Sequence, residues 1–88
     1  MFFVYILQSL KDSGFYVGMS KNIEKRLARH NAGQVKSTSH RRPFRVIYQE
    51  PYSARAEARE REKYLKSYKG SKEKLTIIDS AMAPSSNG

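Results

Sequence analysis

Five side chains in this sequence have the chemistry to bind a phosphate group or a metal ion, or to move a proton. Tyr5 and Tyr16 lie in two apolar runs, where a β-strand would hold a phenol rigidly. Arg26 and His30 fall on one predicted helix, and Glu62 falls on a later one. A guanidinium is a planar donor to phosphate oxygens, and a carboxylate is a hard oxygen ligand suited to Mg²⁺. These groups fit the chemistry of a phosphate ester, provided that the fold brings them together.

The first two elements are predicted to form a β-hairpin. Phe2 to Gln8 is a nearly continuous apolar and aromatic run, which favours a central strand that is buried on both faces. The segment Lys11 to Gly14 has a turn signal, and Phe15 to Met19 is a second short strand. In the right register, both tyrosine hydroxyls would face one side of the sheet.

The remaining elements follow from capping residues and hydrophobic periodicity. We expect a helix from Ser20 or Asn22 to about Ala32, with Gly33 in a left-handed conformation at its end, followed by a polar loop at 34–43. A third strand at 44–50 should lie beside the first strand. A helix from Ser53 to about Tyr68 and a short helix near 72–79 should complete the fold. Pro43 and Pro51 are expected to confine the third strand. This order, ββαβαα, predicts an α/β (α+β) fold with a small three-stranded antiparallel sheet flanked by helices.

The first predicted helix carries two polar groups on or beside its apolar face. Ile23, Arg26, Leu27 and His30 have the i, i+3, i+4, i+7 spacing of a single helix face. Ile23 and Leu27 would anchor this face to the sheet. The alternative interpretation is structural, because Arg26 could extend along the edge of the stripe and His30 could be a hydrogen-bonded residue at its boundary.

The second long helix places one carboxylate on its apolar face, which consists of Ala54, Ala58, Glu62 and Leu65. Glu57 and Glu60 project away from this face, so only Glu62 is directed toward the sheet. Its structural alternative is an i,i+4 pair with Lys66, just as Glu57 can pair with Arg61. Such pairs contribute only about 0.2 to 0.5 kcal/mol and do not require an apolar face, which favours a functional carboxylate.

Composition points to one basic domain. The chain has 88 residues, 17 Lys plus Arg against 8 Asp plus Glu, a formal charge of +9 and no cysteine. This charge attracts phosphate polyanions, so nucleic acid is the leading partner class. The missing cysteines exclude disulfides and fit a cytoplasmic location, and we expect neither a membrane span nor a membrane partner. We assign 1–79 to the domain and 80–88 to a flexible tail.

The ordered set of motifs resembles the GIY-YIG nuclease superfamily, and most closely its short stand-alone bacterial members. The two tyrosine motifs are Phe3-Val4-Tyr5 and Tyr16-Val17-Gly18, followed by Arg26 and by Glu62. The short members' patterns Arg-Leu-x-x-His-Asn and Arg-Arg-Pro-Phe also appear, at 26–31 and 41–44. The resemblance covers roughly residues 2–66. It implies a metal-dependent endonuclease with Mg²⁺ or Mn²⁺ as cofactor and DNA as substrate.

Each residue then has an expected role. Glu62 would bind the metal, and Arg26 would neutralise the non-bridging phosphate oxygens. Tyr16 would be the general base, although a free phenol has a pKa of about 10, so nearby cations must lower it. Tyr5 would hydrogen-bond into the phosphate network, or only cap the core, and His30 would relay a proton or hold Tyr16. Gly18 would let backbone or substrate approach closely.

Other basic residues are candidates for contacts with the phosphate backbone, namely Lys21, Lys36, Arg41, Arg42, Lys66 and Lys69. Such contacts position a nucleic acid without reading its sequence, so we expect structure-directed or non-specific cutting. The first alternative is a nucleic-acid-binding module with little or no cleavage activity, with RNA as another ligand. A weaker alternative is a basic adaptor for another protein. The sequence leaves the oligomeric state open.

Overall fold

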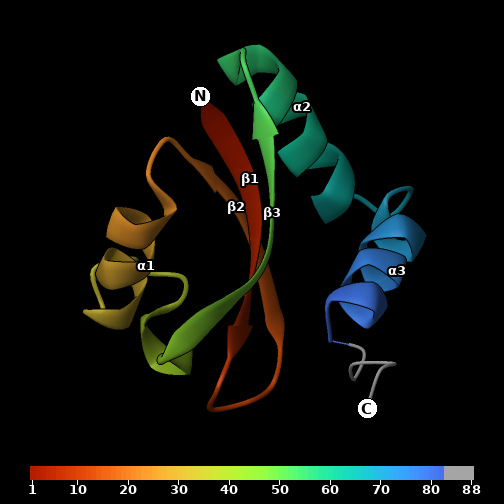
Figure 1. The fold of residues 1–88 in the computed structure, drawn as a ribbon. Helices are drawn as coiled ribbons and strands as arrows, with labels where there is room; N and C mark the ends of the chain where they lie inside the picture. The colour runs from red at the N-terminus through yellow and green to blue at the C-terminus, as the bar shows by residue number, and fades with distance from the viewer. Residues whose placement is uncertain (83–88) are drawn as a thin grey trace, which may run out of the picture.

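The computed structural model describes residues 1–82 and consists of one three-stranded antiparallel sheet with helices on both faces (Figure 1). The strands are β1 (Phe2–Ser9), β2 (Phe15–Ser20) and β3 (Phe44–Tyr52), and the helices are α1 (Ile23–Asn31), α2 (Arg55–Lys66) and α3 (Ser71–Met82), with a short 3-10 helix, η1 (Ser39–Arg41). The predicted α+β class and the order ββαβαα are confirmed.

Strand β1 lies in the centre of the sheet, as its apolar sequence predicts. The strand order is β2-β1-β3, and both neighbours run antiparallel to β1. In the β1–β2 hairpin, Tyr5 lies opposite Gly18, and Leu7 lies opposite Tyr16. Tyr5 and Leu7 are two residues apart on β1, so their side chains share one face of the sheet. Tyr16 lies opposite Leu7, so both tyrosines lie on this face.

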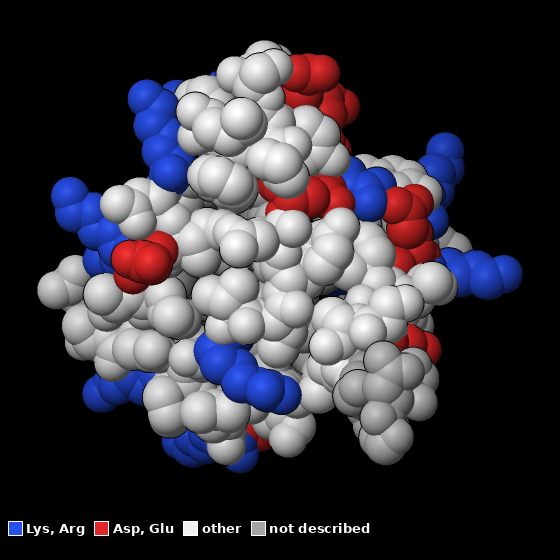
Figure 2. Space-filling view, in the orientation of Figure 1, with Lys and Arg blue, Asp and Glu red and all other residues white. Residues whose placement is uncertain are grey.

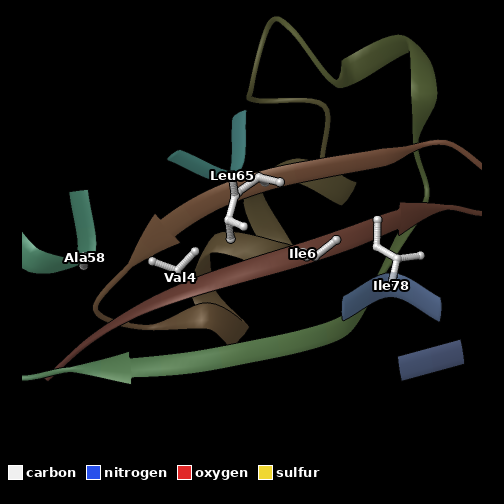
Figure 3. Packing of buried hydrophobic residues seen from close by; sticks show 6 residues of the cluster. Val4, Ile6, Ala58, Leu65 and Ile78 are labelled. Atoms are coloured by element: carbon white, nitrogen blue, oxygen red, sulfur yellow. The ribbon is translucent and has the colours of Figure 1, made fainter. Parts of the chain in front are cut away.

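Each face of the sheet has its own hydrophobic cluster. Val4 and Ile6 of β1 pack with Ala58 and Leu65 of α2 and with Ile78 of α3 (Figure 3). On the opposite face Tyr5, Leu7 and Phe44 form a second cluster, against which Tyr16, Ile23, Leu27 and Val46 pack. The central strand therefore contributes its even residues to α2 and α3, and its odd residues to α1.

Helix α1 begins and ends where its local sequence predicts. The side chain of Asn22 caps the helix by accepting a hydrogen bond from the backbone N–H of Lys25 at 3.0 Å. Gly33, just past the helix, has a φ of 79°, in the left-handed region that glycine adopts without a steric penalty.

The prediction that Pro51 ends the third strand is wrong. Strand β3 continues to Tyr52, and Pro51 lies opposite Phe3 in the β1–β3 pairing. A proline lacks an N–H donor, but β3 is an edge strand, so its outward-facing N–H positions have no neighbouring strand to bond.

The predicted bounds of the last two helices also need correction. Helix α2 begins at Arg55 with Ala54 at its cap position, rather than at a Ser53 cap, and it ends at Lys66 before reaching Tyr68. Helix α3 continues to Met82, so 80–82 belong to the helix and not to a tail. Residues 83–88, the rest of the predicted tail, lie outside the described residues. Within residues 1–82, every helix is too short or too polar to cross a lipid bilayer.

A polar cluster joins β3 to α2 and α3. Glu50 accepts hydrogen bonds from Tyr48 Oη at 2.6 Å, from Tyr52 Oη at 2.7 Å and from Arg61 Nε at 2.6 Å, and Arg61 also pairs with Glu73. The predicted Glu57–Arg61 pair is wrong, because the tertiary partners of Arg61 lie on β3 and α3. Figure 2 shows most of the acidic side chains on the side of α2 and α3, whereas Lys and Arg lie around the edge and also over the lower middle of this face.

Candidate functional site

Tyr5 and Gly18 fit together across the hairpin. A Cβ atom added at Gly18 would lie 2.5 Å from Tyr5 Oη and 2.6 Å from its Cζ, which is too close for any real side chain. Gly18 is buried, and its missing side chain makes room for the tip of the Tyr5 ring. The predicted close approach at Gly18 is therefore made by a protein side chain, the phenol of Tyr5.

His30 lies buried beneath the two tyrosines, with none of its surface exposed. Its Nε2 lies 3.3 Å from Tyr5 Oη, and its Nδ1 lies 2.8 Å from Thr38 Oγ1. Because the Thr38 hydroxyl donates to the carbonyl of Val35, it can accept the Nδ1 proton of His30. Nε2 then accepts a hydrogen bond from Tyr5. Of the two tyrosines only Tyr5 is hydrogen-bonded to His30, because Tyr16 meets the imidazole edge-on, with 5.0 Å between the ring centroids.

The surroundings of His30 favour its neutral form. Burial lowers the pKa of His30, and the positive charges of Arg26 and Arg29 lower it further. A neutral imidazole accepts at Nε2, which agrees with the hydrogen bond from Tyr5. His30 is hydrogen-bonded at both ring nitrogens, as the structural alternative expects, but it is fully buried rather than at the boundary of the stripe.

Tyr5 is held as a neutral phenol. Burial raises the pKa of Tyr5 to about 12, and the nearby phenol of Tyr16 and carboxylate of Glu62 act in the same direction, while Arg26 acts against them. At neutral pH Tyr5 is thus a hydroxyl that donates a hydrogen bond.

Arg26 and Glu62 line one cavity of about 430 Å³ between α1, α2 and the end of β2. The cavity is lined by Phe2, Met19, Ser20, Lys21, Arg26, Arg55, Arg59 and Glu62. Arg26 is half-buried, and within residues 1–82 its Nε atom is buried without a hydrogen-bond partner. Buried donors in folded proteins nearly always have an acceptor, and an anion in the cavity would supply an acceptor for Arg26 Nε.

Lys66 connects Glu62 with Tyr16. Its Nζ lies 3.0 Å from Glu62 Oε2, which confirms the predicted i,i+4 pair, and 5.4 Å from the centre of the Tyr16 ring. Glu62 keeps 18% of its side-chain surface exposed, whereas Glu57 and Glu60 of the same helix are exposed to solvent. Glu62 thus lies on the less exposed side of α2, and its partner Lys66 lies over the ring of Tyr16.

Comparisons with known proteins agree with this arrangement. The family described as the GIY-YIG catalytic domain matches residues 1–75. The chain belongs to the GIY-YIG family.

Relatives of this GIY-YIG protein are small chains of similar length. It is 42% identical over 77 residues to a UPF0213 protein of Staphylococcus saprophyticus, and the match covers 86% of this chain and 92% of that one. It is 41% identical over 78 residues to a UPF0213 protein of Staphylococcus haemolyticus, and the match covers 88% of this chain and 93% of that one. The solution NMR structure of the UPF0213 protein BH0048 from Bacillus halodurans is 31% identical, with a TM-score of 0.51 over 89% of this chain and 85% of that chain. GIY-YIG domains are nuclease domains and generally use divalent metals.

A metal in this GIY-YIG domain would have few protein ligands. Within residues 1–82, no three His, Asp or Glu side chains form a cluster that could bind a metal ion together. Glu62 supplies one carboxylate at a polar cavity, and Mg²⁺ is commonly held by one or two carboxylates while it keeps several waters. The donor set therefore fits a largely hydrated Mg²⁺ or Mn²⁺ bound through Glu62.

The predicted phosphate-contacting residues of this GIY-YIG domain fall into two groups. Lys36, Arg41 and Arg42 lie in the 34–43 loop, and Lys21, Lys66 and Lys69 lie outside it. Lys21 lines the cavity, Lys66 contacts Glu62, and Lys69 lies in the α2–α3 connection. Arg41 pairs with Asp12 at 2.9 Å.

The other two candidates in the 34–43 loop also lie outside the lining of the cavity. Arg42 donates to the carbonyl of Ser39 at 2.7 Å, and Lys36 lies in the same 34–43 loop, whose residues do not line the cavity. Their contact with a phosphate backbone stays a prediction.

Sequence reasoning missed four residues that belong to the site. Thr38 holds His30, and Asn31 joins α1 to β3 by accepting from the N–H of Phe44 at 2.7 Å and donating to its carbonyl. Arg55 and Arg59 line the cavity with Glu62. Their signal was available, since 55, 59 and 62 have the i, i+4, i+7 spacing of one helix face.

Proposed function

We propose that this GIY-YIG protein is a metal-dependent endonuclease that hydrolyses phosphodiester bonds in DNA, in a structure-directed or non-specific manner. The observation that carries the proposal is that Arg26 of α1 and Glu62 of α2 line one cationic cavity, while Lys66, the partner of Glu62, lies over the ring of Tyr16 on β2. Hydrolysis needs a base for water, stabilisation of the phosphoryl charge and help for the leaving oxygen.

Arg26 is suited to the phosphoryl oxygens. Its guanidinium keeps its charge at all relevant pH values, and its buried Nε has no partner within residues 1–82. Arg26 therefore gains a hydrogen bond when a phosphate enters the cavity. A divalent metal at Glu62 would add Lewis-acid stabilisation of the charge that develops on the phosphoryl group.

Tyr16 suits the role of general base better than Tyr5 does. Tyr16 is only half-buried, and the Nζ of Lys66 lies 5.4 Å from the centre of its ring. Tyr5 is neutral and donates to His30, with its pKa raised to about 12 by burial. In this arrangement Tyr5 and His30 form the buried side of the site, while Tyr16 takes the proton from water.

A second candidate function is a nucleic-acid-binding module, for DNA or RNA, without cleavage. One observation favours it: Lys66 already neutralises Glu62 at 3.0 Å, and a carboxylate held by a lysine is a weaker metal ligand. The endonuclease therefore requires that the metal displaces or shares the Lys66 contact.

Cleavage assays with a matched pair of variants separate the two functions. Single-stranded, nicked, branched and duplex DNA, and RNA of the same sequence, are incubated with Mg²⁺, Mn²⁺ or chelator. We expect metal-dependent cleavage by the parent protein and by Glu60→Gln, whose carboxylate is exposed on the opposite side of α2. Glu62→Gln should lower the rate at least 100-fold.

Two results would contradict the proposal. Cleavage that is retained by Glu62→Gln would exclude Glu62 as the metal ligand. Salt-sensitive binding of nucleic acid without cleavage, with either metal and all substrates, would instead establish the binding module.

A further inference from the structure

A second cavity adjoins the one that holds Glu62. It has a volume of about 320 Å³ and is lined by Ser20, Lys21, Asn22, Lys25, Arg26 and Arg29. Ser20, Lys21 and Arg26 line both cavities, so the two lie side by side at the end of β2 and the start of α1. We call the two together the trough.

The trough is strongly cationic. Its basic side chains are Lys21, Lys25, Arg26, Arg29, Arg55 and Arg59, and Glu62 is its one carboxylate. The excess of positive charge is larger than one phosphate monoanion needs for neutralisation. A run of several phosphodiesters matches it better.

These basic side chains form no ion pair with carboxylates of residues 1–82. The ion pairs among residues 1–82 involve Arg41, Arg61 and Lys66, and none involves a basic side chain of the trough. Uncompensated like charges that lie close together repel one another and reduce stability. Their presence along one depression is therefore expected where an anionic ligand binds.

Arg26 stands at the junction of the two cavities. Its buried Nε lacks a partner within residues 1–82, so the junction itself is prepared for an acceptor group. Lys25 and Arg29 lie on one side of this junction, on α1, and Arg55 and Arg59 lie on the other, on α2.

We propose that one polynucleotide strand lies along the trough. Lys25 and Arg29 bind phosphates on one side of the phosphate at Arg26, and Arg55 and Arg59 bind phosphates on the other side. The identity of the central phosphate as the scissile one rests on the proposed nuclease function, whereas the path of the strand is a statement about binding. Since these are phosphate contacts, they set the position of the strand without selecting its sequence.

The test measures binding without metal. A fluorescein-labelled single-stranded DNA and its duplex are titrated by anisotropy in chelator, from 50 to 300 mM salt. The variants are Arg55→Gln/Arg59→Gln, Lys25→Gln/Arg29→Gln and the control Lys11→Gln/Lys72→Gln. The control removes the same charge at exposed positions outside the trough. All four residues under test are exposed, so the variants should fold, as circular dichroism will check.

Each trough variant should weaken binding at least tenfold at 100 mM salt. It should also reduce the slope of log affinity against log salt by about 1.4 for the single strand, because each lost phosphate contact contributes about 0.7. The control should keep the parent slope. A trough variant with the slope of the control, or a parent protein that binds neither DNA, would overturn the proposal.

Failure of this proposal and failure of the nuclease proposal give different results. If the protein binds through the trough but cleaves nothing with either metal, the path of the strand stands and the nuclease function fails. If it cleaves DNA but Arg55→Gln/Arg59→Gln behaves as the control, the nuclease function stands and the trough proposal fails.

Discussion

Nε2 of His30 accepts a hydrogen bond from the hydroxyl of Tyr5, 3.3 Å away, although the two residues are 25 positions apart in the sequence. This contact joins α1 to the central strand beneath the candidate site. It also explains how a buried polar imidazole is tolerated in a small core, since Thr38 satisfies the other ring nitrogen at 2.8 Å.

His30 should make stability fall in mild acid. Burial and the charges of Arg26 and Arg29 lower its pKa in the folded protein, so below about pH 6.5 the unfolded chain binds more protons than the folded one. The free energy of unfolding should therefore decrease as the pH falls from 6.5 toward 5, by up to about 1.4 kcal/mol per pH unit. Urea unfolding at half-unit pH steps measures this slope.

A variant without the imidazole supplies the control for this slope. His30→Gln should be less stable at pH 7 and should lose the slope between pH 6.5 and 5. The carboxylates that are stabilised in the fold, Asp12 and Glu50, have lowered pKa values and act at lower pH. An unchanged slope in His30→Gln would show that another group titrates here.

Gly18→Ala should destabilise the protein through Tyr5. The added Cβ would lie 2.5 Å from the hydroxyl and 2.6 Å from Cζ of Tyr5, and overpacking of this kind costs about 1 to 3 kcal/mol. In a Tyr5→Leu background both atoms are absent, so the same substitution should cost less than about 1 kcal/mol. A double-mutant cycle by urea unfolding measures this coupling, and equal costs in both backgrounds would refute the packing explanation.

The two tyrosines should differ in kinetics. Tyr16→Phe removes the proposed base and should lower the cleavage rate by about 100- to 10,000-fold, with substrate affinity unchanged. Tyr5→Phe removes a hydroxyl that is bonded to His30 and should cause a smaller loss of rate. Single-turnover rates as a function of pH are the measurement. If Tyr5→Phe causes the larger loss, the two roles must be exchanged.

Arg61 should matter for stability rather than for chemistry. It donates to Glu50 at 2.6 Å and also pairs with Glu73, with only 22% of its side chain exposed. Arg61→Met would leave the partly buried Glu50 carboxylate without its cation, at a cost of about 1.5 to 3 kcal/mol. Thermal and urea unfolding measure the loss, while binding of DNA at 10 °C should be retained. Asp12→Asn, at an exposed pair, should have a smaller effect.

The sequence alone predicted the order of the elements and the helix faces that carry Arg26, His30 and Glu62. Capping by Asn22 and Gly33, the alternation along the strands and the spacing of Ala58, Glu62 and Leu65 are local patterns. They report which face of an element a residue occupies. For this reason the central strand, the helix faces and the half-buried position of Glu62 could all be predicted.

Only the tertiary structure decided which of these residues meet. His30 bonds to Tyr5 and only touches the ring of Tyr16, and Arg61 pairs across elements with Glu50 and not along its helix with Glu57. A partner inside one helix contributes a few tenths of a kcal/mol, and a partly buried partner on another element outweighs it. Arg55 and Arg59 likewise became part of the trough only when α2 packed beside the end of β2, because periodicity fixes a face but not what lies opposite that face.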